Sequence, residues 1–336
     1  RTLCLVLALV LAVGLLTVGA GAAFKDDAQI TYKSAVDLLA GLGVINGYED
    51  GSFQPKGNFD RGGLAKMVAY FCWGGADKSA LYAGANVFSD IDSYAWAKGS
   101  INYGYNAGYI SGAGTNKDGK LIYNPAGTVK GSELAKTLLV VLGYKANSDD
   151  AAYALVGSNW ELNSIRLAEQ EGLFANLAAS FNPTAALTRE EAAQMFANLL
   201  AKGYTYTQYN KDNTPVTAVA SLGVDPMAKY FGNWTANKNQ TDDFGRPVTT
   251  YTKGATTVSV GTNPTLTYTT PVTEAKVFAD LHLTSALDTA KIKKSVNGAA
   301  DAAATLTYNG GAISDSGNGV LTEVFYDDVA DTMVIT

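Results

Sequence analysis

The sequence predicts a multidomain protein in which an α-helical module of three related helix-loop-helix units is followed by a β-rich region. Three observations favour this fold class. An aromatic-x-proline pattern occurs three times, each copy at the same distance before an apolar run with helical spacing. A glycine stands at a matching place after an upstream helical run in every copy. Beyond residue 202, β-branched and aromatic stretches alternate with turn residues, as is typical of strands.

The first residues have the pattern of a secretory signal peptide. Arg1 precedes a nearly continuous apolar run over residues 3–18, and the small-residue site Ala20-Gly21-Ala22 follows it. We expect residues 1–23 to be cleaved on secretion; the alternative is a membrane anchor, because such a run approaches the roughly 18 residues that span a bilayer. The chain stops within a strand-like run, so we also expect it to continue in a longer protein.

Composition argues against several function classes. The net charge of −6 gives no reason to expect a nucleic-acid partner. His282 is the one histidine of the chain, which excludes most histidine-based catalysis and metal sites. After cleavage Cys72 is the one cysteine left, so no internal disulfide is expected. We interpret Cys72 as a small buried residue at the end of an apolar helical run.

The aromatic-x-proline pattern is the centre of a repeat. Its copies are Phe53-Gln54-Pro55, Tyr123-Asn124-Pro125 and Phe181-Asn182-Pro183. A second helix is predicted to start five residues after each proline. Upstream, a first helix is predicted to end at a glycine, where the left-handed conformation costs least: Gly43, Gly108 and Gly172. We therefore divide the module into units at residues 24–85, 86–145 and 146–202.

The second helices begin with capping residues. Their starts read Asp60-Arg61-Gly62-Gly63, Lys130-Gly131-Ser132-Glu133 and Thr188-Arg189-Glu190-Glu191. Thr188 and Glu191 are predicted to form a capping box, in which each side chain bonds the backbone amide of the other. Asp60 is expected to cap the first of these helices by itself, and Glu133 supplies half of the box in the second.

Capping does not explain an arginine in the first turn of a helix, where the helix dipole disfavours a cation. Arg61 and Arg189 occupy this place in two of the copies. An arginine beside exposed helix N-terminal amides can hold an anionic ligand, and the alternative is a solvated side chain. Because neither arginine caps a helix, we expect alanine at either position to leave the melting temperature unchanged.

Several motifs together resemble the S-layer homology domain family. They are two Phe-x-Asp starts, Phe24-Lys25-Asp26 and Phe88-Ser89-Asp90, the segment Gly47–Pro55, and the box at 188–191. The resemblance covers roughly residues 24–202. It implies that three repeats form one pseudo-trimeric α-helical module, which binds the anionic, often pyruvylated, secondary polymer of bacterial cell walls and catalyses nothing. The arginine of the box would grip a carboxylate of the polymer in a groove between repeats.

The resemblance also implies a site and a location. The residues expected to bind the wall polymer are Arg61, Arg189, Lys130, Asp60, Gly47, Asp50 and Gly112. No cofactor and no metal are implied. We expect a secreted protein of the bacterial cell wall or S-layer, with self-assembly into a surface lattice and no membrane contact after signal cleavage.

The sequence departs from the family pattern in each unit. Gly131 stands where the second unit should carry arginine, with Lys130 as the nearest substitute. Gly63 replaces the glutamate of the first box, and Asn176 replaces a glycine of the sister units. Asparagine tolerates left-handed backbone, so the fold is expected to survive these changes better than the site. We therefore expect one or two competent grooves.

Residues 203–336 are predicted to form a β-rich sandwich or small barrel used for assembly or display. The predicted strands lie at 204–207, 249–252, 256–260, 265–269, 305–308 and within 322–336, and a short helix is expected within 218–230. The acidic pairs Asp242-Asp243 and Asp327-Asp328 are candidates for calcium binding, although a solvated acidic edge is the favoured reading.

Two functions remain open from the sequence. The favoured one is a non-catalytic surface-layer role. The alternative is a wall-anchored enzyme, such as a glycoside hydrolase, whose catalytic domain lies in a C-terminal continuation. The chain contains no Gly-x-Ser-x-Gly or His-Glu-x-x-His motif to favour the enzyme.

Overall fold

The computed structural model describes residues 24–84, 86–201, 225–242, 245–262, 264–268, 272–283, 287–296, 299–300, 321–327 and 331–336. The expected signal peptide, residues 1–23, lies outside these ranges. The described residues form two compact units. A helical unit spans 24–235 with 253–258, and a β-rich unit spans 236–252 with 259–336.

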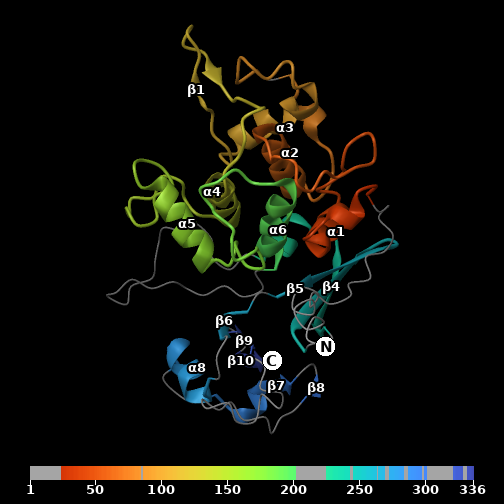
Figure 1. Ribbon diagram of the computed structural model, residues 1–336, viewed down its shortest axis with the longest axis vertical. Helices are drawn as coiled ribbons and strands as arrows, with labels where there is room; N and C mark the ends of the chain where they lie inside the picture. Colours follow the sequence, from red (N-terminus) through yellow and green to blue (C-terminus); the bar gives the residue numbers. More distant parts are fainter. Residues whose placement is uncertain are drawn as a thin grey trace, which may run out of the picture. The chain divides into compact units, whose positions relative to one another are not determined.

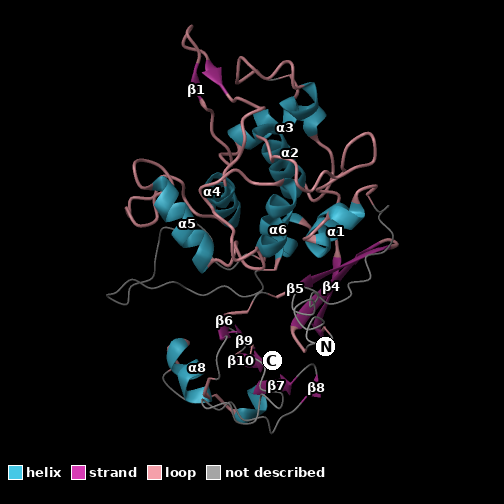
Figure 2. Ribbon diagram, viewed as in Figure 1, coloured by secondary structure: helices cyan, strands magenta, loops and turns pink. Residues whose placement is uncertain are grey.

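The helical unit is built from helices joined by loops (Figure 1, Figure 2). Its elements are η1 (Asp27–Gln29), α1 (Lys33–Gly41), α2 (Arg61–Cys72), η2 (Ser79–Tyr82), α3 (Ala95–Asn106), β1 (Gly114–Thr115), β2 (Leu121–Ile122), α4 (Gly131–Leu142), α5 (Trp160–Gln170), α6 (Arg189–Leu200) and α7 (Pro226–Tyr230). Helix α2 packs against α3, α4 against α5, and α6 against α1. The second helix of one predicted unit therefore meets the first helix of the next, and the α6–α1 pair closes the arrangement.

A closed ring of three backbone hydrogen bonds joins the segments that precede α2, α4 and α6. The amide of Phe59 donates to the carbonyl of Leu187 over 2.9 Å, and the amide of Leu187 donates to Val129 over 2.8 Å. The amide of Val129 donates to Phe59 over 2.9 Å, which completes the ring. All three side chains are at most 1% exposed. Each residue directly precedes the N-cap of its helix, so the ring fixes where the three helices start.

The predicted caps and helix ends are confirmed. Asp60 Oδ1 accepts from the amide of Gly63 over 2.6 Å, and Thr188 Oγ1 accepts from the amide of Glu191 over 3.3 Å. Glu191 and Glu133 each accept from the amide of their own N-cap residue, over 2.8 and 2.9 Å. The three glycines predicted to be left-handed have φ of 78°, 77° and 70°: Gly43, Gly108 and Gly172.

The aspartates of the two Phe-x-Asp motifs hold the aromatic-x-proline loops. The carboxylate of Asp26 accepts from the amides of Phe53 and Gln54 over 2.8 and 2.7 Å. Asp90 accepts from Tyr123 and Asn124 over 2.9 and 2.7 Å. Gln54 and Asn124 both have φ of 56°, a left-handed conformation that is unfavourable for residues with a Cβ atom. The two aspartate bonds therefore stabilise a strained turn in front of each proline.

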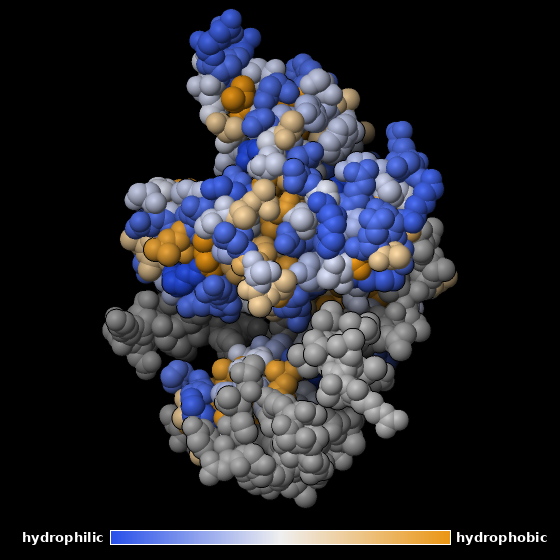
Figure 3. All heavy atoms as spheres, in the orientation of Figure 1, coloured by the Kyte–Doolittle hydropathy of each residue, from blue (hydrophilic) through white to orange (hydrophobic). Residues whose placement is uncertain are grey.

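The second unit carries a hairpin where the first has a tight turn. Strands β1 and β2 pair antiparallel, with Gly114 opposite Ile122. The hairpin projects from the helical unit in Figure 1, and hydrophilic residues cover its tip in Figure 3. It is a solvated extension that adds no side chain to the core.

Residues beyond the third predicted unit complete the helical core. The rings of Tyr230 and Phe231 lie 5.3 and 5.4 Å from the ring of Phe71 in α2. Phe231 and Met227 are each 1% exposed, and the hydroxyl of Tyr230 donates to the carbonyl of Val141 in α4 over 2.8 Å. The short helix expected within 218–230 is confirmed over Pro226–Tyr230, and the part before residue 225 lies outside the described residues.

The β-rich unit contains a mixed five-stranded sheet in the order β6-β9-β10-β7-β8, in which β10 and β7 are parallel. The strands are β6 (Leu266–Tyr268), β7 (Ile292–Val296), β8 (Ala299–Ala300), β9 (Thr322–Asp327) and β10 (Thr332–Ile335). Val277 of α8 (Glu274–Asp280) joins the core of this sheet, and the 3₁₀ helix η3 (Thr289–Lys291) directly precedes β7.

A second sheet has the order β3 (Thr235–Thr241), β4 (Pro247–Lys253) and β5 (Thr256–Gly261). The strands predicted at 249–252, 256–260, 265–269 and within 322–336 are confirmed, whereas 204–207 and 305–308 lie outside the described residues. In the described part, a helix packs on the five-stranded sheet, which differs from the expected sandwich or barrel. Strand spacing by itself does not reveal what covers a sheet.

We expect Asp26→Asn to lower the melting temperature at neutral pH by a few degrees and to have little effect in strong acid. Desolvation raises the pKa of Asp26, but hydrogen bonds from Phe53 and Gln54 outweigh it and leave this pKa below its ordinary value. The stabilisation is therefore complete above about pH 4 and is lost as the pH falls through the lowered pKa. Thermal unfolding of both proteins at several pH values measures this, and a difference that stays constant with pH would contradict the assignment.

Phe231→Ala should destabilise the helical unit by about 3–5 kcal/mol, because it removes a buried ring that fills the space beside Phe71. Urea unfolding of residues 24–235 gives the free energy of unfolding. Leu162→Ala is the control, since this leucine is 67% exposed, and it should change stability little. Equal effects of the two substitutions would show that residues 225–234 are not part of the helical core.

Candidate functional site

Three junctions lie at the N-termini of the second helices, each against the aromatic-x-proline loop of the next unit. The first junction joins α2 to residues 123–127, the second joins α4 to 181–185, and the third joins α6 to 53–57. The two leading amides of each helix donate to loop carbonyls: Arg61 to Gly127 (2.9 Å), Gly62 to Pro125 (2.9 Å), Gly131 to Ala185 (3.3 Å), Ser132 to Pro183 (2.7 Å), Arg189 to Gly57 (3.0 Å) and Glu190 to Pro55 (3.1 Å).

These bonds correct the expectation that the helix N-termini offer exposed amides to an anion. The loop of the neighbouring unit already accepts from them. Any anion held at a junction must therefore be held by side chains.

The two arginines hold the neighbouring loop in the same way. Arg61 Nε donates to the carbonyl of Tyr123 over 2.8 Å, and its guanidinium carbon lies 4.5 Å from the centre of the Tyr123 ring. Arg189 Nε donates to the carbonyl of Phe53 over 2.8 Å, with the Phe53 ring at 5.0 Å and the Tyr48 ring at 4.6 Å. These contacts argue against the expectation that alanine at either position leaves the melting temperature unchanged, because each arginine joins two units through a hydrogen bond and a cation–π contact.

The outer nitrogens distinguish the two arginines. Arg61 Nη2 donates to the carbonyl of Ser111 over 2.7 Å, and Nη1 lies 3.8 Å from Glu133 Oε1. The terminal nitrogens of Arg189 have no hydrogen-bond or ion-pair partner among the described residues. Burial lowers the pKa of Arg189, against the opposing effect of nearby Tyr48, Asp60 and Asp26. Of the two arginines, Arg61 is the one whose outer nitrogens are engaged by other described residues.

The second junction has neither an arginine nor room for one. A Cβ atom on Gly131 would lie 2.8 Å from Pro183 Cα and 2.9 Å from Phe181 Cζ. Lys130 is exposed and forms an ion pair of 3.6 Å with Glu161, whose Oε1 also accepts from Ser132 Oγ over 2.8 Å. Lys130 is thus paired within the protein and cannot supply the forked contact of an arginine.

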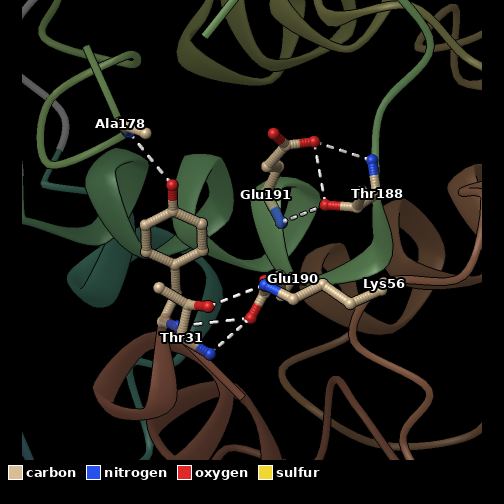
Figure 4. A network of polar contacts seen from close by, with 7 residues as sticks. Thr31, Lys56, Ala178, Thr188, Glu190 and Glu191 are labelled. Carbon is tan, nitrogen blue, oxygen red and sulfur yellow. Dashed lines mark hydrogen bonds and ion pairs between the residues drawn. The ribbon is translucent and has the colours of Figure 1, made fainter. Parts of the chain in front are cut away.

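The third junction contains a buried carboxylate that the sequence analysis missed. Glu190 is 2% exposed and accepts from the amides of Thr31 and Tyr32 over 2.6 and 3.4 Å (Figure 4). It also forms an ion pair with Lys56, whose Nζ donates to Thr31 Oγ1 over 2.7 Å. The same helix position holds Gly62 in the first unit, so the sequence itself shows that the third unit differs here by a glutamate. Glu190 fastens α1 to α6 and neutralises Lys56.

A tryptophan lies near the start of each of the helices α3 and α5. Trp96 is 50% exposed, and a Cβ atom on Gly62 would lie 3.1 Å from its ring. Lys66 Nζ lies 5.7 Å from the Trp96 ring, and Lys136 Nζ lies 5.4 Å from the ring of Trp160. Each ring thus lies beside a lysine of the second helix of the preceding unit. Trp96 in fact offers a flat apolar face next to a cation.

The remaining predicted site residues have structural surroundings. Gly47 has φ of 68°, and a Cβ atom there would lie 2.6 Å from the Phe24 ring. A Cβ atom on Gly112 would likewise lie 2.8 Å from the Phe88 ring, but the backbone of Gly112 is not left-handed. The limited space, and not the backbone conformation, therefore requires glycine here. Asp50 accepts from the amide and hydroxyl of Ser52 over 2.9 and 2.7 Å, which lowers its pKa. Asn176, which occupies in the third unit the position of Gly47 in the first, has φ of 60°, as expected.

Within the described ranges, no group of His, Cys, Asp and Glu side chains is arranged to hold a metal ion, and no helix is long and apolar enough to cross a membrane. Asp243 and Asp328 lie outside these ranges, and Asp242 is paired with Arg246 at 2.7 Å. Cys72 is partly exposed, and burial raises the pKa of its thiol to about 12.

Comparison with known families places the first two predicted units. Residues 23–62 and 87–135 match the S-layer homology domain. These matches support a relation of the matched residues to the S-layer homology family. They contain both Phe-x-Asp motifs, Arg61 and Trp96, whereas residues 146–202 are not among them. S-layer homology domains anchor proteins to the cell wall, so the chain is a surface, wall-associated protein. No curated protein matches the chain.

Arg61→Ala and Arg189→Ala should each lower the stability of the helical unit by roughly 1–3 kcal/mol, because each leaves a loop carbonyl without its donor. Lys130→Ala is the matched control, since its exposed ammonium holds only a surface ion pair, and it should change stability by less than about 1 kcal/mol. Urea unfolding measures all three. Arginine variants as stable as the wild type would show that these contacts do not hold the units together.

Proposed function

We propose that the chain anchors a secreted surface protein to the bacterial cell wall by binding an anionic, pyruvate-bearing secondary wall polymer, without catalysing a reaction. The matches to the S-layer homology domain support wall association. The observation that carries the proposed ligand class is Arg189, whose terminal nitrogens have no partner among the described residues.

The third unit, residues 146–202, is proposed as a third S-layer homology repeat. Its support is the ring of hydrogen bonds, in which Leu187 stands where Phe59 and Val129 stand in the other units. Arg189 also repeats the contacts of Arg61, with a backbone carbonyl and an aromatic ring of the following loop. A sequence that diverged from the family pattern can preserve these backbone contacts.

The chemistry of the third junction suits a carboxylate-bearing sugar. A carboxylate accepts two parallel hydrogen bonds from a guanidinium, and the terminal nitrogens of Arg189 are the donors for such a pair. The Tyr48 ring, 44% exposed, lies beside the same guanidinium and provides an apolar face for the sugar. Binding of this kind at a single groove is modest, and attachment through several grooves or chains makes it firm.

The β-rich unit is proposed to serve assembly or display, with formation of a surface lattice as its extension. Its mixed sheet has a core of its own, made by Val272, Val277, Leu287, Val324, Tyr326, Met333 and Ile335. Wall binding then belongs to the helical unit, and the β-rich unit contacts other surface proteins.

The chain should sediment with purified cell-wall sacculi and should remain in solution after the secondary polymer has been extracted from them. Arg189→Ala should reduce sedimentation with native sacculi, because it removes the open guanidinium. Lys130→Ala is the control and should sediment like the wild type. Equal binding to native and extracted sacculi would point to peptidoglycan as the ligand, and no binding to either would overturn the anchoring role.

A further inference from the structure

The third residue of a second helix can lie next to the arginine of the preceding unit. In the first junction, Glu133 at this place in α4 has Oε1 3.8 Å from Arg61 Nη1. Its Oε2 accepts from the amide of Lys130 over 2.9 Å, so the capping bond holds the carboxylate there. Arg61 therefore has a counter-ion that belongs to the protein itself.

The equivalent position in the third junction is occupied by glycine. The three junctions are related by the same backbone bonds, from the leading helix amide to the loop of the next unit. By this relation, Arg189 corresponds to Arg61, and Gly63 corresponds to Glu133. Gly63 carries no side chain, and Arg189 has no ion pair among the described residues. In the second junction, the residues at these two positions are Gly131 and Glu191, so this junction has no arginine.

Other acids near Arg189 are committed to backbone groups. Asp26 accepts from the amides of Phe53 and Gln54, and Asp60 accepts from the amide of Gly63. Lys56, on the loop beside Arg189, is neutralised by the buried Glu190. The third junction is left with one partly buried guanidinium and no carboxylate bonded to it, an arrangement that favours an anionic ligand.

We propose that the third residue of the second helix selects which junction accepts the carboxylate of the polymer. Glu133 occupies Arg61 and weakens the first junction, while Gly63 leaves Arg189 open and makes the third junction the main anion-binding groove. This inference rests on the proposed function and assigns its ligand to one of the junctions.

The charge at this position can be exchanged without removing the helix cap. Glutamine and glutamate both complete a capping box, so Glu133→Gln removes the counter-ion of Arg61 and retains the cap. Conversely, Gly63→Glu places a carboxylate where Arg189 has none. A Cβ atom on Gly63 would lie 3.2 Å from Asp60 Oδ1 and 3.3 Å from the Phe59 ring, so small shifts are needed. Gly63→Gln makes the same demand on space and is the uncharged control.

The experiment is a titration of the nitrogen-15-labelled full chain with a methyl glycoside that bears a pyruvate ketal. The Nε–H groups of Arg61 and Arg189 both donate to carbonyls at 2.8 Å, which slows their exchange with water and makes their signals observable. Arginine-to-lysine variants assign the two signals. In the wild type, the Arg189 signal should shift at lower probe concentration than the Arg61 signal.

The variants should move the response between the junctions. Gly63→Glu should weaken the Arg189 response roughly tenfold relative to Gly63→Gln, the effect of losing one charge-assisted contact. Glu133→Gln should strengthen the Arg61 response but leave it weaker than that of Arg189, because Ser111 still accepts from Arg61 Nη2. Glu191→Gln, the same change beside the junction without an arginine, should leave both signals as in the wild type.

Three outcomes would overturn the inference. They are an Arg61 response as strong as that of Arg189 in the wild type, equal behaviour of Gly63→Glu and Gly63→Gln, and no response of either arginine. Sedimentation with sacculi separates this failure from that of the proposed function. If the wild type sediments with native but not extracted sacculi, anchoring stands and only the assignment to Arg189 fails.

Discussion

The closed ring of hydrogen bonds between Phe59, Val129 and Leu187 is the constraint on which the helical unit depends. Each of these residues directly precedes a helix N-cap, so the ring sets the start of α2, α4 and α6 together. It also brings each helix start against the loop of the next unit, where the leading amides find carbonyl partners. The ring includes the segment before α6, so the unit closes on itself, and α1 packs against α6 although the two helices lie far apart in the chain.

Each arginine can hold the neighbouring loop and still have donors left, because a guanidinium has donors in a fixed fork. The Nε–H group of each arginine donates to a loop carbonyl, so the two terminal nitrogens remain for another partner. In Arg61 that partner is the protein itself, through Ser111 and Glu133. In Arg189 the outer nitrogens have no partner within the described residues. The same residue type at the same place thus has different polar partners, according to the carbonyl and the carboxylate that lie beside it.

The α6–α1 junction shows how the fold tolerates divergence between units. Trp96 and Trp160 lie near the start of their helices, whereas α1 begins at Lys33 and leaves the amides of Thr31 and Tyr32 to the carboxylate of Glu190. Lys56 balances this buried charge. Burying a carboxylate is costly unless it is paired and hydrogen-bonded, and Glu190 meets both conditions. The charged contacts of Glu190 therefore take the place that the contact between Trp96 and Gly62 has at the first junction, and the helical unit remains closed.

Local features were predictable from the sequence because they depend on neighbouring residues. The capping box of Thr188 and Glu191, the left-handed glycines at helix ends and the places of the second helices follow from short-range backbone chemistry. The β-rich region was also predictable in kind, since β-branched runs and turns are local signals, but not its mixed sheet, whose parallel β7–β10 pair joins distant segments.

The roles of the site residues were decided by the tertiary structure. The sequence placed Arg61 and Arg189 at helix starts but did not show that the amides beside them are taken by another unit, that Tyr123 and Phe53 supply the carbonyls for their side chains, or that Glu133 lies beside one arginine only. Glu190 and Lys56 are 134 residues apart, and nothing in their local sequence pairs them. Hydrogen bonds and charge balance across such separations depend on how the chain closes, so only the folded structure determines which arginine is open.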